Sequence, residues 1–347
     1  MTDAPVPDGI DAGGVTAWLE AHAPGVVAPL RFSLIAGGRS NLTYTVTDSA
    51  GDRFVLRRPP LGPLLPSAHD MGREHRIMTA LAGSSVPVPP VVGLCTDEAV
   101  TGAPFYVMRF VDGLILRDPA VVEPVSEAVR WAAAESLVDV LADLHAVDPD
   151  DVGLGDLGRR DGYVERLLRR WRGQWEKSKS REIPLVEEVA DRLAARIPAA
   201  GPAGIVHGDY RLDNAIVAAE DGAVRAVLDW ELCTLGDPLA DLGQLLMYWT
   251  EPDDEFSALY WAPTRAPGFP GRKEVTARYA ARSGRDLSDL DFYVALAYWK
   301  GACILEGVYV RYASGQYPAT DDSWRSFESV VPQMAEAADE YARRAGR

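Results

Sequence analysis

The chain has 347 residues, a length that suits two closely joined lobes better than one small core. Hydrophobic residues make up 47% of it and charged residues 25%, which is ordinary for a folded protein and argues against extensive disorder. The net charge of −16 disfavours a nucleic-acid partner, because binding to nucleic acid needs a basic surface that releases counterions.

No targeting or membrane segment is predicted. The first residues, Met1–Pro5, contain neither the basic nor the apolar region of a secretory signal. No stretch approaches the roughly 20 apolar residues that a membrane-spanning helix needs. The 3 cysteines are widely spaced and predict neither a disulfide framework nor a metal site. We therefore expect a protein of the reducing cytoplasm that does not bind membranes.

Residues 1–111 are predicted to form a small, mostly antiparallel sheet with few helices. One helix is expected around Val15–His22 and another over Met71–Leu81, where Ile77 and Leu81 share one face. The strands are separated by turn signals and are expected at Phe32–Ile35, Leu42–Val46, Phe54–Arg57, Val91–Cys95 and Pro104–Met108.

Residues 112–347 are predicted to be mainly helical, so the expected fold class is α+β with two lobes. The expected helical segments are Val125–Leu144, one or two helices within Tyr163–Arg196, Glu274–Arg282, Leu290–Tyr312 and Trp324–Arg344. One β element interrupts them. Gly204–Val206 is apolar, and Ala215–Val217 and Val224–Leu228 flank the turn residues Glu220–Gly222, which indicates a hairpin.

Several widespread motifs are missing. The sequence contains no Gly-Lys pair, which excludes a phosphate-binding loop of the Walker type. The segment Gly153–Gly158 matches a dinucleotide-binding pattern in spacing, but it follows an acidic turn and not a strand, so we interpret it as a loop. Neither a zinc-binding His-Glu-x-x-His nor a Gly-x-Ser-x-Gly nucleophile elbow is present.

The most informative residues lie around the predicted hairpin, in His207–Asn214 and Leu228–Glu231. Asp209 follows a strand, where its carboxylate can face a substrate hydroxyl. Asn214 comes five residues later and offers an amide oxygen, a suitable ligand for Mg²⁺. Asp229 ends the second strand of the hairpin, so strand pairing can bring it beside Asn214. This order reproduces, in reduced form, the catalytic arrangement of protein kinases.

These residues resemble the aminoglycoside phosphotransferase family of the protein-kinase-like superfamily, whose signature is His-Gly-Asp-x-x-x-x-Asn followed by a strand that ends on Asp. The segment Thr234–Leu242 is similar to the family's Gly-Asp-Pro-x-x-Asp. Phe54–Pro60 and Asp229–Glu231 resemble the kinase-like domains related to those fused to acyl-CoA dehydrogenases. The resemblance extends from about Leu30 to the C-terminus and implies a bilobal protein-kinase-like fold.

The resemblance also implies roles for the residues of the second lobe. Asp209 is expected to be the catalytic base or the carboxylate that orients the hydroxyl, and Asn214 and Asp229 are expected to hold Mg²⁺. Taken singly, each of these residues could merely cap a turn. We expect His207 and Asp241 to be structural, and Asp237 to cap a helix that begins near Pro238.

In the first lobe, the resemblance implies that Arg57 replaces the phosphate-contacting lysine of the family, since this lobe contains no lysine. Arg58 is an alternative, because neighbouring residues of a strand point to opposite faces. Glu74 is expected to pair with Arg57. Glu231 could contact the metal shell or substrate, or form a structural salt bridge.

The resemblance also implies that the nucleotide contacts two further parts of the first lobe. Ser40 and Asn41 belong to the loop that is predicted to cover the phosphates. The backbone at Arg109 and Val111 is predicted to meet the base.

The expected function is therefore a Mg²⁺-dependent kinase that transfers a phosphoryl group from ATP or GTP to a small-molecule hydroxyl. The candidate acceptors are an aminoglycoside and another metabolite, such as an acyl-CoA-linked one, and we favour a metabolite. An alternative is a catalytically silent nucleotide-binding regulatory pseudokinase. Such proteins usually lose the base or a metal ligand, whereas this chain keeps all three. A purely structural interaction protein, the third possibility, would bind no nucleotide.

Overall fold

The computed structural model describes residues 5–35, 41–62, 69–257, 261–315 and 322–346. The chain is divided into two compact units. Unit 1 comprises Met1–Gly113 and Arg225–Glu231, and unit 2 comprises Leu114–Val224 and Leu232–Arg347. No helix among the described residues is both long and apolar enough to cross a membrane.

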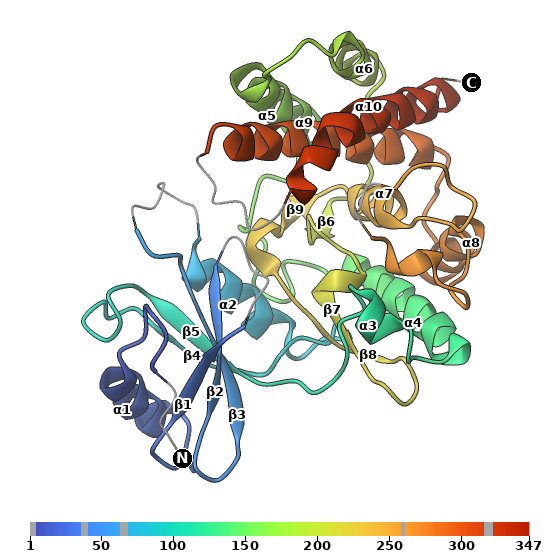
Figure 1. Cartoon of the computed structure of the whole chain (residues 1–347). Coiled ribbons are helices and arrows are strands. Elements are labelled where there is room, and N and C mark those ends of the chain that lie inside the picture. Colours follow the sequence, from blue (N-terminus) through green and yellow to red (C-terminus); the bar gives the residue numbers. More distant parts are fainter. Residues whose placement is uncertain (1–4, 36–40, 63–68, 258–260, 316–321, 347) are drawn as a thin grey trace. The chain divides into compact units, whose positions relative to one another are not determined.

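Unit 1 is built on a five-stranded antiparallel sheet (Figure 1). The strands lie in the order β1-β2-β3-β5-β4. Their bounds are Arg31–Leu34 (β1), Leu42–Thr47 (β2), Arg53–Arg58 (β3), Val91–Cys95 (β4) and Phe105–Arg109 (β5). Because side chains alternate between the two faces of a strand, Tyr44 and Val46 of β2 are both fully buried on one face.

The first helix of unit 1, α1 (Ala12–His22), begins earlier than the sequence predicts. The side chain of Asp11 accepts a hydrogen bond from the N–H of Gly14 at 2.7 Å, which fixes the start of the helix. The helix buries Val15 and Leu19 in a core shared with the sheet. Burying each such side chain contributes about 1.5–3 kcal/mol.

The second helix of unit 1, α2 (Met71–Leu81), has the predicted bounds. Asp70 caps it by accepting a hydrogen bond from the N–H of Arg73 at 3.0 Å. Its buried face carries Ile77, Leu81 and one charged residue, Glu74. An unpaired buried carboxylate is costly, so the position of Glu74 indicates a partner on the sheet.

The segment Arg225–Glu231 belongs to unit 1, whereas the sequence placed all of residues 112–347 in the helical lobe. Two hydrogen bonds attach it there. The N–H of Val227 donates to the carbonyl of Pro87 at 2.8 Å, and the guanidinium of Arg225 donates to the carbonyl of Asp112 at 3.3 Å. These partners lie more than a hundred residues away along the chain. Local sequence patterns do not reveal contacts of this range.

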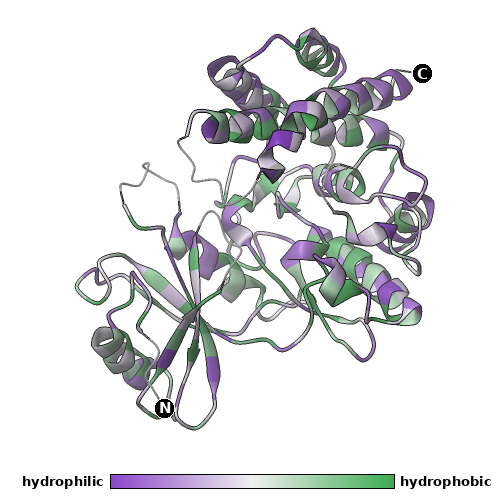
Figure 2. Ribbon diagram, viewed as in Figure 1, coloured by the Kyte–Doolittle hydropathy of each residue, from purple (hydrophilic) through white to green (hydrophobic). Residues whose placement is uncertain are grey.

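Unit 2 is mainly helical, and its longest helix, α9 (Leu290–Ala313), contacts α5, α6, α7 and α10. The other helices are α3 (Pro119–Val122), α4 (Glu127–Ala146), α5 (Tyr163–Ser178), α6 (Pro184–Ala194), α7 (Leu239–Tyr248), α8 (Arg272–Ser283) and α10 (Phe327–Arg344). Figure 2 colours much of α4 as hydrophobic, whereas α10 shows both hydrophobic and hydrophilic sides. This agrees with the apolar residues that α4 buries along most of its length.

Short strands position the loops of unit 2. β6 (Gly204–Val206) pairs antiparallel with β9 (Thr234–Gly236), a strand that the sequence analysis did not identify. β7 (Ala215–Val217) precedes the predicted turn, which the N–H of Ala218 closes by donating to the carbonyl of Ala223 at 2.8 Å. The chain then enters β8 (Val224–Val227), in which it passes from unit 2 to unit 1.

Candidate active site

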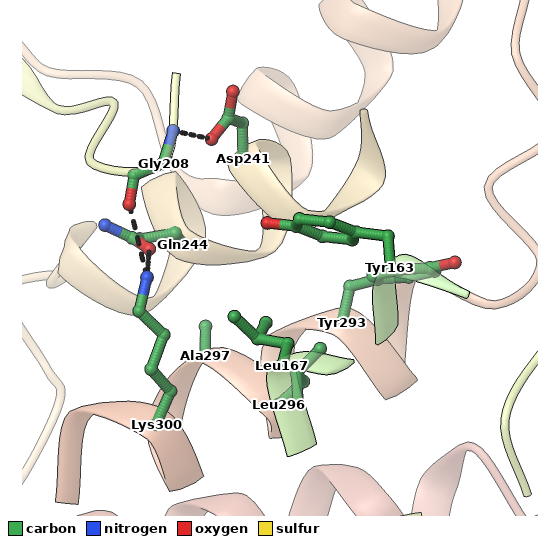
Figure 3. A pocket seen from close by; sticks show the side chains of 10 residues that line it. Tyr163, Leu167, Gly208, Asp241, Gln244, Tyr293, Leu296, Ala297 and Lys300 are labelled. Atoms are coloured by element: carbon green, nitrogen blue, oxygen red, sulfur yellow. Dashed lines mark hydrogen bonds between the residues drawn. The ribbon is translucent and has the colours of Figure 1, made fainter. Parts of the chain in front are cut away.

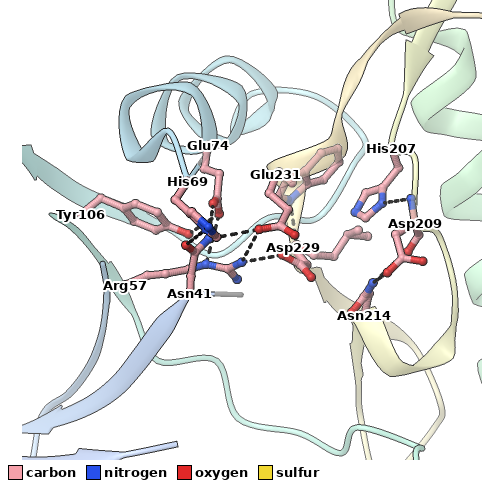
Figure 4. Close-up of polar contacts among 12 residues, drawn as sticks. Asn41, Arg57, His69, Glu74, Tyr106, His207, Asp209, Asn214, Asp229 and Glu231 are labelled. Atoms are coloured by element: carbon pink, nitrogen blue, oxygen red, sulfur yellow. Dashed lines mark hydrogen bonds and ion pairs between the residues drawn. The ribbon is translucent and has the colours of Figure 1, made fainter. Parts of the chain in front are cut away.

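In unit 1, the side chain of Arg57 lies among three carboxylates (Figure 4). Its Nη2 is 2.5 Å from Oδ1 of Asp229 and 3.8 Å from Oε2 of Glu231, and its Nε is 3.3 Å from Oε2 of Glu74. The predicted ion pair between Arg57 and Glu74 is therefore present. The guanidinium of Arg57 lies among carboxylate acceptors, and a contact with phosphate stays a prediction.

Arg58 points away from this cluster and contacts backbone carbonyls. Its guanidinium donates to the carbonyls of Gly9, Pro59 and Thr101, the last at 3.0 Å. The alternation of β3 explains the difference, because it directs the two arginines to opposite faces. Of the two, Arg57 is the one whose surroundings suit a phosphate-binding role, which remains a prediction.

Glu74 is almost fully buried and hydrogen-bonded on both oxygens. Oε2 accepts from the hydroxyl of Tyr106 at 2.9 Å, and Oε1 accepts from Nδ2 of Asn41 at 3.1 Å. Burial raises the pKa of Glu74 to about 7, although Arg57 and the Tyr106 hydrogen bond act in the opposite direction. The carboxyl of Glu74 therefore titrates close to neutral pH.

Asn41 links this cluster to the loop that is predicted to cover the phosphates. Its Nδ2 also lies 3.2 Å from Oε2 of Glu231, and its Oδ1 contacts Nδ1 of His69 at 2.8 Å. These bonds occupy the buried amide of Asn41. Ser40, the other residue predicted for this role, lies outside the described residues.

Asp229 has an unusual backbone conformation, with φ of 66°. Residues other than glycine rarely adopt this left-handed region, although Asp and Asn tolerate it better than most. Such strain occurs preferentially at functional sites. Oδ1 of Asp229 binds Arg57, and no hydrogen bond from the described residues reaches its Oδ2. One carboxylate oxygen of Asp229 is therefore available to a ligand.

The two backbone positions predicted to contact the base, Arg109 and Val111, differ in whether their N–H is already hydrogen-bonded. The N–H of Arg109 donates to the carbonyl of Pro90 at 2.8 Å, so it is already used within the sheet. The side chain of Arg109 lies over the ring of Phe54. Among the described residues, none bonds to the N–H of Val111. A backbone contact with a nucleotide base thus stays a prediction, and Val111 is the better donor for it.

In unit 2, the loop after β6 carries Asp209 and is fixed by a buried carboxylate. Oδ2 of Asp241 accepts from the N–H of His207 at 2.6 Å, and Oδ1 accepts from the N–H of Gly208 at 2.8 Å. Gly208 has φ of +86°, and a Cβ there would lie 2.9 Å from the carbonyl oxygen of Leu232, so only glycine fits. Asp241 therefore has the structural role that the sequence predicted.

The groups around Asp241 favour the ionised form of its carboxyl. Burial by itself raises the pKa of Asp241, but the hydrogen bonds from His145 and Gly208 and the nearby histidines outweigh burial and lower it. Nε2 of His145 is 3.4 Å from Oδ2 of Asp241, and Nδ1 of His145 is 2.7 Å from the hydroxyl of Tyr279. Since a carboxylate only accepts, Nε2 carries the hydrogen, and Nδ1 accepts from Tyr279.

His207 is fully buried, and its Nδ1 accepts a hydrogen bond from the N–H of Asp209 at 3.3 Å. Its ring also packs edge-on against Tyr210. This is the structural hydrogen-bonding role that the sequence predicted for it. Asp237 likewise accepts from the N–H of Leu239 at 3.0 Å, at the start of α7, as predicted.

Asp209 and Asn214 lie side by side. Nδ2 of Asn214 donates to the backbone carbonyl of Asp209 at 2.8 Å and to its Oδ2 at 3.1 Å. Because the amide nitrogen faces Asp209, the amide oxygen of Asn214 is directed elsewhere. No hydrogen bond from the described residues reaches that oxygen.

Two residues near Asp209 were not assigned a role from the sequence, Gln244 on α7 and Lys300 on α9. Nε2 of Gln244 donates to Oδ1 of Asp209 at 2.8 Å, and Nζ of Lys300 donates to Oε1 of Gln244 at 2.7 Å. One signal in the sequence could have identified Lys300. It is one of four lysines in the chain and interrupts an apolar helical run.

Asn214 and Asp229, the two predicted Mg²⁺ ligands, each carry an oxygen of the kind that Mg²⁺ prefers. Among the residues that the structure describes, no three His, Cys, Asp or Glu side chains are grouped to hold a metal. The protein would thus supply few ligands, namely the amide oxygen of Asn214 and Oδ2 of Asp229. Mg²⁺ commonly takes only one or two protein ligands and completes its shell with phosphate and water. Whether the two residues meet at one ion stays a prediction.

Comparison with known proteins places this chain among phosphotransferases. A family model described as the phosphotransferase enzyme family matches residues 31–277. The mouse protein called acyl-CoA dehydrogenase family member 10 is 35% identical over 345 residues. That match covers 94% of this chain but only 30% of the length of the mouse protein.

Solved structures agree with the family match. A candidate aminoglycoside phosphotransferase of Ralstonia eutropha is 34% identical, with a TM-score of 0.81, over 96% of this chain and 98% of that one. The aminoglycoside phosphotransferase APH(4)-Ia, solved with AMP-PNP and hygromycin B, has a TM-score of 0.61 over 95% of this chain and 98% of that one. At 16% identity this second likeness concerns the fold alone. The predicted protein-kinase-like α+β fold is confirmed.

Proposed function

Because the chain belongs to the phosphotransferase enzyme family, we propose that it is a small-molecule kinase. It transfers the γ-phosphoryl group of ATP or GTP to a hydroxyl of its substrate. The observation that carries the proposal is the carboxylate of Asp209, which Gln244 and Asn214 hold on its two oxygens. A fixed carboxylate suits phosphoryl transfer, which depends mainly on positioning and electrostatics.

Asp209 is the residue that acts on the acceptor. Its carboxylate receives a hydrogen bond from the substrate hydroxyl, orients that oxygen for in-line attack on the γ-phosphorus, and accepts the proton as the new P–O bond forms. Breaking the bond between the γ-phosphorus and the β–γ bridging oxygen then leaves the nucleoside diphosphate. A positioned general base of this kind typically contributes a factor of about 10²–10⁴ in rate.

Two groups would neutralise the phosphates. Arg57 would exchange part of its contact with Asp229 and Glu231 for a bidentate contact with phosphate oxygens. Asn214 and Asp229 would hold Mg²⁺, which when bound offsets the negative charge of the phosphate oxygens. The AMP-PNP bound by APH(4)-Ia supports a nucleoside triphosphate as donor.

We favour a hydroxylated metabolite, such as one linked to coenzyme A, over an aminoglycoside as the acceptor. The support is the name of the mouse relative, which contains an acyl-CoA dehydrogenase designation and is 35% identical to this chain. A test panel therefore needs hydroxyacyl-CoA thioesters, free hydroxy acids, sugars, amino alcohols and aminoglycosides.

The test combines nucleotide binding with turnover in variants that preserve the local backbone. Asp209→Asn is expected to keep the Mg²⁺-dependent thermal shift with ATP or GTP while phosphoryl transfer falls by about 10²–10⁴-fold. Asp229→Asn is expected to lose the Mg²⁺-dependent part of the shift. Asparagine is preferred to alanine at position 229, because it tolerates the left-handed backbone there. Exposed Asp253→Asn serves as the control.

Three possible results distinguish the active kinase from the alternative functions. Wild-type turnover in Asp209→Asn would refute the role of Asp209. Nucleotide binding without transfer to any member of the panel would favour a silent regulatory module. No nucleotide binding at all would favour a structural interaction protein.

A further inference from the structure

Lys300 holds an unusual position for a lysine. It follows the buried residues Leu296 and Ala297 on α9 and extends toward the Asp209 loop (Figure 3). Its ammonium donates to two neutral oxygens, Oε1 of Gln244 at 2.7 Å and the carbonyl of Gly208 at 3.2 Å. Among the described residues, no carboxylate lies within ion-pair distance of it.

Such an arrangement is energetically costly. Taking an ammonium out of water disfavours its charged form, and burial accordingly lowers the pKa of Lys300, although Asp209 and Asp241 act in the opposite direction. A leucine or methionine at this place in α9 would pack without that cost. The lysine therefore points to a role beyond packing.

The bond from Lys300 fixes which way the Gln244 amide faces. An ammonium only donates hydrogen bonds, so the amide oxygen of Gln244 must face Lys300. A carboxylate only accepts, so the amide nitrogen must face Asp209, and it does so at 2.8 Å from Oδ1. The buried amide of Gln244 thus lies between a positive and a negative group, each of which favours the same orientation.

The same contacts hold the backbone before Asp209. Lys300 binds the carbonyl of Gly208, and Asp241 binds its N–H, so both polar groups of this glycine are engaged. Asn214 contacts the second oxygen of the Asp209 carboxylate. With Gln244 on the first oxygen, rotation of the carboxylate is restricted on both sides.

We propose that Lys300 is a positioning residue that acts through Gln244 to orient the carboxylate of Asp209. The kinetic part of this inference rests on the proposed kinase function. The competing explanation is that Lys300 only anchors the loop through the carbonyl of Gly208. In that case the bond to Gln244 would have no effect on Asp209.

A double-mutant cycle separates the two explanations. The variants are Lys300→Met, Gln244→Leu and the pair together, with exposed Lys273→Met as a matched loss of one lysine. The measurement is kcat and KM for Mg·ATP hydrolysis with water as the acceptor. A misplaced catalytic group typically costs up to about 10²-fold. We expect each single variant to lower kcat by about 10–100-fold at unchanged KM. The double variant should be no slower than the slower single variant.

The cycle overturns the proposal if the effects of the two substitutions multiply, because Lys300 would then act independently of Gln244. A wild-type kcat in Lys300→Met overturns it as well. An equal loss of kcat in Lys273→Met also overturns the proposal, because it would show a general effect of removing a positive charge.

A second measurement does not need turnover. The ¹H–¹⁵N resonances of the Gln244 side-chain amide can be identified by their loss in Gln244→Leu. We expect them to shift in Lys300→Met and in Asp209→Asn, but not in Lys273→Met. If the wild-type chain turned over no nucleotide, the proposed function would fail. The shift of the Gln244 resonances would still test whether Lys300 acts on Asp209 through Gln244. Unchanged Gln244 resonances in Lys300→Met would overturn the link itself.

Discussion

Replacing Asp241 with asparagine tests how strongly one buried carboxylate fixes the loop that carries Asp209. Asp241 is 1% exposed and accepts hydrogen bonds from two consecutive N–H groups, those of His207 and Gly208. Asparagine has nearly the same shape but only one acceptor oxygen. Whichever way its amide turns, its NH₂ group must face one of the two backbone donors.

The magnitude follows from these contacts. A hydrogen bond to a charged group contributes about 1.5–3 kcal/mol, and a buried donor left without a partner costs about 1–3 kcal/mol. The variant loses one such bond entirely and weakens the other. We therefore expect the free energy of unfolding of unit 2 to fall by about 3 kcal/mol. Loosening of the loop should also lower kcat for phosphoryl transfer without changing the KM for nucleotide.

The loss should also depend on pH. The pKa of Asp241 in the folded chain is below its ordinary value of 3.8, so the carboxylate stabilises the fold above that pH. As the pH falls below 3.8, the unfolded chain binds a proton first and the contribution is lost. The difference between wild type and variant should therefore shrink in acid.

Urea unfolding followed by tryptophan fluorescence measures the difference, and Asp253→Asn, an exposed substitution of the same kind, gives the background. Hydrogen exchange of the His207 and Gly208 amides reports the loop directly, and both should exchange faster in the variant. A loss below about 0.5 kcal/mol, which is typical of surface substitutions, would refute the reasoning. So would unchanged exchange at both amides.

Three further substitutions test packing and charge. Gly243→Ala on α7 would place a Cβ 2.5 Å from the carbonyl carbon of Tyr293 on α9. The free energy of unfolding, measured in urea, should therefore fall by about 1–3 kcal/mol. A Cβ added at Gly173 meets no atom within 4 Å, so Gly173→Ala should raise the free energy of unfolding by up to about 1 kcal/mol. Equal effects of the two substitutions would contradict this account. For Glu74, whose pKa burial raises to about 7, ionisation costs more in the folded chain than in the unfolded chain. The stability of unit 1 without ligands should fall as pH rises from 4.5 to about 7, and Glu74→Gln should flatten this slope; a slope that persists in the variant would assign it to another group.

The elements that the sequence predicted best are those with local signals. The helix Met71–Leu81 starts at a capping aspartate and keeps one apolar face, and both features are visible without any long-range contact. The one-turn helix Pro119–Val122 and the strand Thr234–Gly236 were not identified. They are too short for a periodic pattern to develop, and the strand exists through its pairing with Gly204–Val206.

The sequence by itself identified Asp209 and Asn214 as candidate site residues through their order and spacing, and the structure shows that they contact each other. The ion pair of Arg57 with Glu74 was expected from the family resemblance and not from the sequence pattern alone. Only the tertiary structure placed Gln244 and Lys300 near Asp209. Gln244 lies 35 residues from Asp209 along the chain, and Lys300 lies a further 56 residues beyond Gln244. Contacts of that range depend on how whole helices pack, and no local pattern of side chains encodes them.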